Sequence, residues 1–138
     1  MVSRLVLSSK NLKHLISLSE DALPLECCAL LVGETKIGSL IEVVVADAIS
    51  VQNLDRSSAS FSIEPGELLN VYRLAEAKKL QVVGIFHSHP SHPIPSPTDQ
   101  KYMKINPVVW LIYSTTTGRF GAFIFEDSIR KVELQVME

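Results

Sequence analysis

The segment that most limits the fold is "QVVGIFHSH", residues 81–89, in which an apolar run ends in two histidines. Apolar side chains occupy both odd and even positions of this run as far as Phe86. Since neighbouring side chains of a strand point to opposite faces, the run predicts a strand that is buried on both faces. We therefore expect this strand in the centre of a sheet, with other elements packed on each side.

Helices and strands alternate in the rest of the chain. Helical spacing of apolar residues predicts a helix at residues 8–23, which serines begin and Pro24 ends. A second helix is expected at residues 64–79, with proline in its first turn, and a third begins at Ser96. The other apolar runs predict strands at residues 2–7, 26–34, 40–50, 60–63, 108–114, 119–126 and 129–136. This order favours an α/β fold, a mixed β-sheet sandwiched by helices.

The spacing within the two longer helices also predicts which side chains are buried. The second helix should bury one face, formed by Leu68, Val71, Tyr72 and Ala75. His14 falls outside the apolar stripe of the first helix, so we expect it on the solvated surface. Both helices should therefore cover the sheet with one face and present the other face to water.

Length and composition fit a single domain over residues 1–138. Apolar residues make up 46% of the chain and charged residues 20%, which is typical of a globular protein. The net charge of −2, with basic residues scattered, argues against nucleic acid and against an anionic membrane as the main partner. The apolar runs are too short to cross a bilayer and the N-terminal segment lacks the pattern of a signal peptide, so we expect a cytoplasmic protein.

The only two cysteines of the sequence, Cys27 and Cys28, are adjacent within an apolar run. This spacing is neither a CxxC redox pair nor a disulfide framework. We expect free thiols packed in the core, where cysteine behaves as a small apolar residue. A reactive or metal-linked thiol is the alternative.

The two histidines that end the central strand are candidates for a metal site. His87 and His89 are two residues apart, so their side chains project from the same face of the strand. Two imidazoles so arranged can bind zinc, and a catalytic zinc site needs a third protein ligand and an open position. Asp99 is the obvious oxygen donor, because the prolines at positions 90, 93, 95 and 97 stiffen the path from His89.

A purely structural interpretation of the same segment is also open. Residues 96–99 make a good helix start, with Ser96 at the cap, proline at the first position and Asp99 at the third. The two interpretations are compatible, because a helix can be capped by Ser96 and still direct Asp99 at a metal ion.

Glu26 is the candidate for a general base. It stands at the start of an apolar strand, where an unpaired buried charge would be costly unless it had a function. A hydrolytic zinc site needs such a carboxylate to position the attacking water and transfer its proton. The alternative is that Glu26 is an exposed carboxylate at the end of a strand.

Together these motifs resemble the JAMM (MPN-plus) family of zinc metalloproteases. The resemblance rests on Glu26 with the following "CCALLVGE", and on "VVGIFHSHPSHPIPSPTD", which contains HxHP and then a serine and an aspartate separated by two residues. It extends over nearly the whole chain, because the elements around these motifs follow the family's order. The implied fold is a curved mixed sheet between helices, a JAMM/MPN domain that is related to cytidine deaminases.

The resemblance implies a role for each of five residues. His87, His89 and Asp99 would bind one zinc ion per chain, Glu26 would be the general acid/base, and Ser96 would stabilise the oxyanion of the tetrahedral intermediate. The implied reaction is hydrolysis, by a zinc-activated water, of the isopeptide or peptide bond after the C-terminal glycines of a ubiquitin-like or sulfur-carrier protein. We expect a short, prokaryotic-type enzyme, monomeric or homodimeric, whose substrate adds its Gly-Gly tail as a strand at the edge of the sheet.

One spacing departs from the pattern of the family. Six residues separate His89 from Ser96, where the family usually has seven. A tighter bend can absorb this deletion, or Ser96 can be displaced from the oxyanion. His92, in the same loop, is expected to be solvated, with contact to the substrate and metal ligation as alternatives.

Two other functions are weighed against a zinc isopeptidase. Non-catalytic MPN-type scaffold proteins have lost metal ligands, whereas all five functional positions are present here. A zinc nucleoside deaminase requires HxE followed by PCxxC, but this chain has HSH and its cysteines precede it. The sequence also lacks HExxH, the motif of helix-borne zinc proteases. The motifs therefore favour the isopeptidase.

Overall fold

The computed structural model describes residues 1–55 and 62–138 of the chain. The strand expected at residues 60–63 lies partly outside these ranges, and residues 62 and 63 are not in a strand. The other expected elements are confirmed, in the order β1 (Val2–Ser8), α1 (Ser9–Ala22), β2 (Cys28–Ile37), β3 (Ile41–Val51), α2 (Pro65–Ala77), β4 (Gln81–His89), α3 (Pro97–Ile105), β5 (Val109–Ser114), β6 (Phe120–Glu126) and β7 (Ser128–Met137). Within the described ranges, none of the helices is both long and apolar enough to cross a membrane.

Local signals in the sequence set the ends of the helices. The Ser8 hydroxyl caps α1 by accepting a hydrogen bond of 3.0 Å from the backbone N–H of Asn11. The same helix ends at Ala22, two residues before Pro24, as expected. Pro65 occupies the first turn of α2, where a missing N–H does no harm.

The strands form a closed barrel rather than an open sheet. They lie side by side in the order β1, β3, β2, β4, β5, β6, β7, and β7 then pairs in parallel with β1. The β1–β3 and β4–β5 pairs are also parallel and the other pairs are antiparallel, so the expected mixed sheet is confirmed. The expected sandwich of a sheet between helices is not confirmed, because the sheet closes on itself. Every described strand has two neighbours, which leaves no edge strand to which a substrate tail could add.

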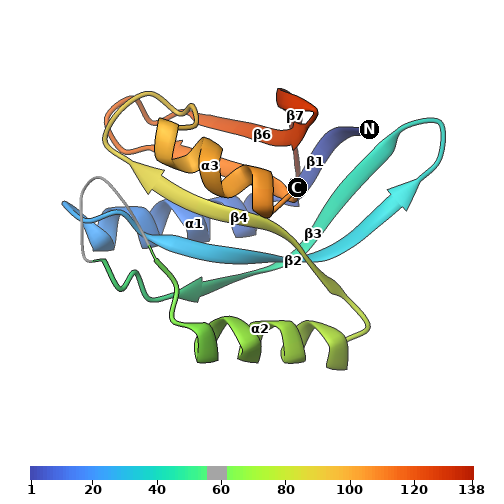
Figure 1. Ribbon diagram of the computed structural model, residues 1–138, viewed down its shortest axis with the longest axis horizontal. Coiled ribbons are helices and arrows are strands. Elements are labelled where there is room, and N and C mark those ends of the chain that lie inside the picture. The colour runs from blue at the N-terminus through green and yellow to red at the C-terminus, as the bar shows by residue number, and fades with distance from the viewer. Residues whose placement is uncertain (56–61) are drawn as a thin grey trace.

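The three helices lie on different sides of the sheet. Figure 1 shows α1 behind β2 and β4, α3 in front of β4, and α2 below the sheet. Leu15 of α1 packs with Phe86 in the larger apolar cluster, whereas Val71 and Ala75 of α2 belong to a smaller cluster with β2. The prediction for the buried face of α2 was wrong at Tyr72, whose relative exposure is 49%.

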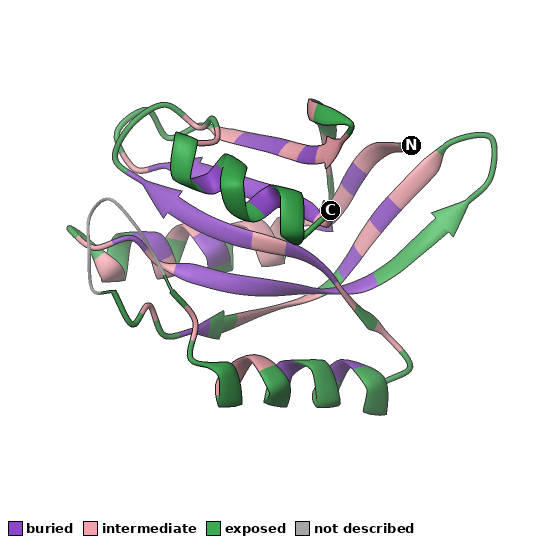
Figure 2. Ribbon diagram, viewed as in Figure 1, coloured by how far each residue is buried: buried purple, intermediate pink, exposed green. Residues whose placement is uncertain are grey.

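β4 is the central, doubly covered strand that the sequence predicts. It pairs antiparallel with β2 and in parallel with β5, and its second half is almost wholly buried (Figure 2). Phe86 packs in the larger cluster and Ile85 against the smaller one, so the strand separates two apolar layers. His87 and His89 follow Ile85 at intervals of two residues and therefore lie on its face of the sheet.

The proline-rich loop after β4 packs closely against β6. A Cβ atom added at Gly121 would lie only 2.2 Å from the carbonyl oxygen of Pro93. Thr116 follows β5, and its hydroxyl donates a hydrogen bond of 2.6 Å to the carbonyl of Pro90. This close packing and this hydrogen bond hold the chain between β4 and α3 in place.

We expect Gly121→Ala to lower the free energy of unfolding by about 1–3 kcal/mol, the usual cost of overpacking, because a backbone carbonyl cannot turn aside as a side chain can. Gly38→Ala is the matched control, since a Cβ there would lie 3.9 Å from its nearest neighbour, the Leu40 carbonyl oxygen. Chemical denaturation of both variants measures the difference. Equal unfolding free energies would contradict the close packing of the loop on β6.

Candidate functional site

The site is built on the last three residues of β4. The side chains of His87 and His89 have relative exposures of 0% and 5%. Their rings lie side by side, with centroids 5.1 Å apart. Pairing with β2 and β5 holds His87 on both sides of the strand, so its position is fixed by the ladder rather than by a loop.

The first turn of α3 brings a carboxylate to the two rings. Figure 1 shows that α3 begins beside the C-terminal end of β4. Asp99 Oδ1 lies 3.2 Å from His87 Nε2, and Asp99 Oδ2 lies 3.6 Å from His89 Nε2. The ligand atoms of the three residues all lie within 4.8 Å of one another, so the group could hold a metal ion.

Asp99 serves as a cap and also faces the histidines. The Ser96 hydroxyl accepts a hydrogen bond of 3.0 Å from the Asp99 N–H, and the Ser96 N–H donates one of 2.9 Å to Asp99 Oδ2. This is a complete capping box. The capping interpretation is therefore confirmed, and it coexists with the convergence of Asp99 on His87 and His89.

Glu26 lies on the opposite side of the His87 ring from Asp99. It precedes β2 by two residues and has a relative exposure of 5%, so it is not the exposed strand-end carboxylate of the alternative interpretation. Its Oε1 atom lies 3.3 Å from His87 Nδ1. Trp110 packs edge-on against the same imidazole, with ring centroids 6.0 Å apart and planes at 86°. The His87 ring is thus held between two carboxylates and an indole.

The two carboxylates set the electrostatics of the site. Burial opposes protonation of His87, but the contacts with Asp99 and Glu26 outweigh this effect and raise the pKa of His87 to about 9. Burial by itself would raise the pKa of Asp99, whereas the contacts with His87 and His89 lower it further than burial raises it. The negative potential that favours a proton on His87 would also favour a metal cation at the same nitrogens.

The donor set fits a zinc ion. Catalytic zinc sites use three nitrogen or oxygen ligands from the protein and keep a fourth position open. His89 Nε2 is buried and makes no hydrogen bond with any described residue, so it offers a free coordinating atom. The other nitrogen of this ring, Nδ1, lies 3.2 Å from the Ser91 hydroxyl. A hydrogen bond to the second ring nitrogen is the usual way to orient a metal-binding histidine.

The remaining expectations from the sequence are largely confirmed. His14 and His92 are exposed, Cys28 is buried and Cys27 is half-buried, and both thiols are free. Burial raises the pKa of the Cys28 thiol to about 12, which makes it an inert core residue. His92 thus lies on the surface of the proline loop rather than with the buried histidines.

Sequence reasoning missed three residues around the site. Asn53 donates a hydrogen bond of 2.9 Å from Nδ2 to the carbonyl of Glu26, and Ser91 and Trp110 contact the histidines as described above. Asn53 lies in a polar stretch and Trp110 in an apolar run, so neither forms a motif. Only the position of Ser91, two residues after His89, gives a local signal.

Fold and site together define a small α/β protein with a candidate metal centre at the end of its central strand. The chain belongs to the family described as prokaryotic homologs of the JAB domain, which matches residues 8–124. This match confirms the resemblance to the JAMM family that the histidine motif indicates.

Two known proteins show how far the similarity extends. A protein of Pyrococcus furiosus named desampylase is 38% identical over 88 residues, which are 63% of this chain and 62% of that relative's length. The solution structure of a Desulfitobacterium hafniense protein is 28% identical, with a TM-score of 0.83 over 97% of this chain and 93% of the other. The structural likeness therefore includes nearly every element described above.

The dual position of Asp99 leads to a direct test. If Asp99 is a metal ligand, we expect Asp99→Ala to bind no zinc in the presence of a chelator, because two imidazoles are too few to hold the ion. Asp99→Glu should remain folded, since glutamate also serves a capping box, but its extra methylene displaces the carboxylate and should lower the zinc content. Zinc per chain is measured by elemental analysis after dialysis, and stability by thermal unfolding.

His92→Ala is the control for this experiment, because it changes an exposed imidazole in the same loop. It should keep zinc at the wild-type level, which we expect to be about one ion per chain. Asp99→Ala protein that stays folded and retains its zinc would mean that Asp99 is a helix cap only.

Proposed function

We propose that the protein is a zinc-dependent isopeptidase or peptidase that cleaves after the C-terminal glycines of a ubiquitin-like or sulfur-carrier protein. The observation that carries the proposal is the convergence of His87, His89 and Asp99, with Glu26 on the far side of His87. Membership of the JAB family and the identity to a relative named desampylase support the same activity.

We assign His87, His89 and Asp99 as the ligands of one zinc ion. Both Nε2 atoms face the carboxylate of Asp99, and the capping box holds this carboxylate in place. When bound, zinc would act as a Lewis acid: it would polarise the scissile carbonyl and lower the pKa of the attacking water. The strand pairing of β4 and the capping box of α3 hold the three side chains in place without a metal ion.

Glu26 is assigned as the general acid/base. A buried carboxylate beside the ligands can accept the proton of the attacking water and return it to the leaving amine. Its contact with His87 Nδ1 has a second use, because a carboxylate that accepts a hydrogen bond from Nδ1 leaves the lone pair of Nε2 free for a metal. Glu26 would thus position a ligand and transfer a proton.

Ser96 is assigned to the oxyanion. Its hydroxyl oxygen accepts the hydrogen bond from the Asp99 N–H, and a serine hydroxyl still has one hydrogen to donate. A donor at this place can stabilise the negative charge that develops on the scissile carbonyl oxygen.

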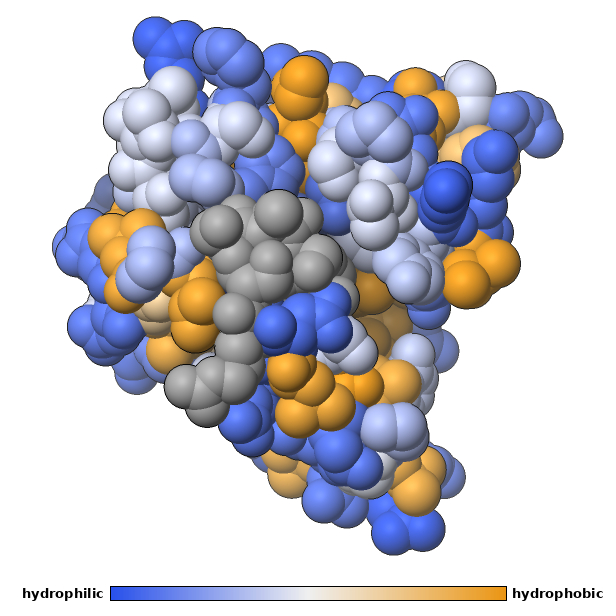
Figure 3. Space-filling view, turned by 60° about the vertical axis from the view of Figure 1, so that its left-hand side comes forward, coloured by the Kyte–Doolittle hydropathy of each residue, from blue (hydrophilic) through white to orange (hydrophobic). Residues whose placement is uncertain are grey.

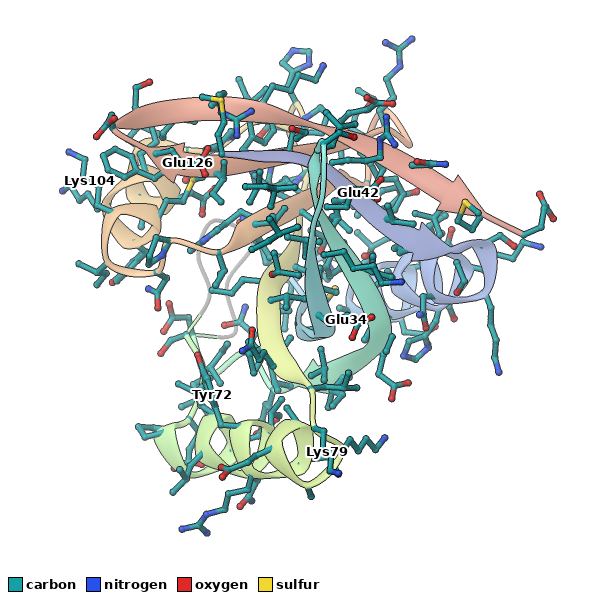
Figure 4. All side chains as sticks on the ribbon, turned by 90° about the vertical axis from the view of Figure 1, so that its right-hand side faces the viewer. Glu34, Glu42, Tyr72, Lys79, Lys104 and Glu126 are labelled. Carbon is teal, nitrogen blue, oxygen red and sulfur yellow. The ribbon has the colours of Figure 1, made fainter. Side chains whose placement is uncertain are left out.

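A groove beside the site is our candidate for binding the ubiquitin-like substrate. It has a volume of about 500 Å³ and is lined by Leu68 and Tyr72 of α2, Tyr102 and Ile105 of α3, and Ile85 and Trp110 of the sheet. Figure 3 shows apolar side chains in a hollow between the upper and lower parts of the surface, and Figure 4 shows Tyr72 rising from α2 toward this space.

Three observations favour a protein substrate in this groove. The closed barrel offers no edge strand, so the Gly-Gly tail of the substrate cannot pair with the sheet edge as the sequence led us to expect, and it must bind elsewhere. Trp110 belongs to the groove and also contacts His87, which joins the groove to the candidate metal centre. Tyr102 and Ile105 are 49% and 73% exposed, and such apolar surface is typical of a docking site.

We expect Glu26→Gln to retain zinc but to lower kcat by about 10²–10⁴-fold, the scale for losing a positioned general acid/base. The amide oxygen of glutamine can still accept a hydrogen bond from His87, but the amide cannot accept the proton of the attacking water. Turnover is measured on a ubiquitin-like protein of the host whose terminal glycine is joined to a lysine.

Two results of this measurement would contradict the proposal in different ways. Near-normal turnover of Glu26→Gln would show that Glu26 is not the general acid/base. Zinc-loaded wild-type protein without turnover on any Gly-Gly tail would instead favour the non-catalytic MPN-type scaffold.

The groove is tested by removing its most exposed apolar side chain. Ile105→Ser should raise KM by about tenfold with little change in kcat, because the apolar contact with the substrate is worth about 1–2 kcal/mol. Ile37→Ser is the matched control, since Ile37 is 81% exposed at the end of β2 and lies outside the groove. Equal KM values for the two variants would exclude docking in the groove.

A further inference from the structure

The connection between β2 and β3 continues past the end of their ladder through one side chain. The backbone pairing of the two strands ends at Cys28 and Val51. Glu26 lies before this point, so its carbonyl has no place in the ladder. The amide of Asn53, two residues after β3, donates a hydrogen bond of 2.9 Å to this carbonyl. A side chain thus replaces the next backbone contact between the strands.

The chain around Asn53 is held from several directions. Its Oδ1 atom accepts hydrogen bonds of 3.1 Å from the Asp55 N–H and 3.0 Å from the Ser62 N–H. Beside it, the Gln52 N–H donates a hydrogen bond of 2.8 Å to a carboxylate oxygen of Glu67 in α2. Asn53 is therefore fixed in place without the help of Glu26, and it can serve as an anchor.

Glu26 needs such an anchor because it lies outside any helix or strand. On its C-terminal side, Cys27 is tied to β4 by a hydrogen bond of 3.1 Å from its N–H to the Ser88 hydroxyl and by another of 3.1 Å from the Ser88 N–H to its carbonyl. Asn53 supplies the hydrogen bond to Glu26 itself. These three hydrogen bonds together fix the backbone that carries the Glu26 carboxylate beside His87.

We propose that Asn53 is a positioning residue for catalysis: by holding the backbone of Glu26, it places the carboxylate for proton transfer. This inference rests on the proposed function, in which Glu26 is the general acid/base. Small displacements of a proton-transfer group have large effects on rate, because the reaction depends on its distance and orientation. Removal of the hydrogen bond should therefore lower kcat more than it changes substrate binding or zinc content.

Asn53→Asp removes this hydrogen bond. The aspartate keeps an acceptor for the N–H groups of Asp55 and Ser62, but it loses the donor to the Glu26 carbonyl. We expect kcat to fall by about 10–100-fold, with KM within about threefold of the wild-type value and zinc content unchanged. Asn53→Ala removes the same donor without adding a charge, and it tests the proposal if the aspartate variant does not fold. Gln52→Ala, at the neighbouring exposed position, is the control and should be fully active.

A double-mutant cycle with Glu26→Gln separates positioning from a general structural effect. If Asn53 acts through Glu26, the Asn53 substitution should cause little further loss of kcat once Glu26 is glutamine. The inference would be overturned if the kcat of the double variant fell by the product of the two single reductions. It would also be overturned if folded Asn53→Asp and Asn53→Ala proteins had normal kcat. Wild-type protein without turnover would overturn the proposed function itself. This result is distinguishable from failure of the Asn53 inference, because it is seen in the wild type alone.

Discussion

The burial of two imidazoles together with two carboxylates is the constraint on which the rest of this structure depends. A buried charge without a partner is strongly destabilising, and each of the four groups is at least 95% buried, as relative exposures of 5% or less show. His87 is in contact with Asp99 on one side and Glu26 on the other, which offsets part of this cost. The proline loop, its packing on Gly121 and the cap of α3 all serve to bring Asp99 to this place.

Asp99 shows that stability and function need not compete for a residue. Its backbone and one carboxylate oxygen complete the capping box with Ser96, and both carboxylate oxygens face the histidines. A capped helix start restricts the rotamers of its third residue, so the cap also fixes the carboxylate toward β4. The same local motif therefore begins a helix and prepares a metal ligand.

Much of the fold could be predicted because its signals are local. Apolar periodicity, serine caps and prolines define the ends of single elements, and they placed β4 and the helices correctly. The closure of the barrel could not be predicted in this way, because the pairing of β1 with β7 joins residues more than a hundred positions apart. Tyr72 has helical spacing suited to the core, but it lies in the groove between α2 and α3, where the sheet leaves its side chain uncovered.

For the site, the sequence by itself determined which chemical groups are available and which of them share a face. Two histidines at the end of a strand must project together, and an aspartate at the third position of a capped helix must lie near the helix start. Only the tertiary structure decided that Glu26 meets His87 and that Asn53 holds Glu26, because these residues are distant in sequence and are joined by pairing between strands. Local patterns fix the direction of a side chain, whereas contacts between distant elements depend on how the whole sheet closes.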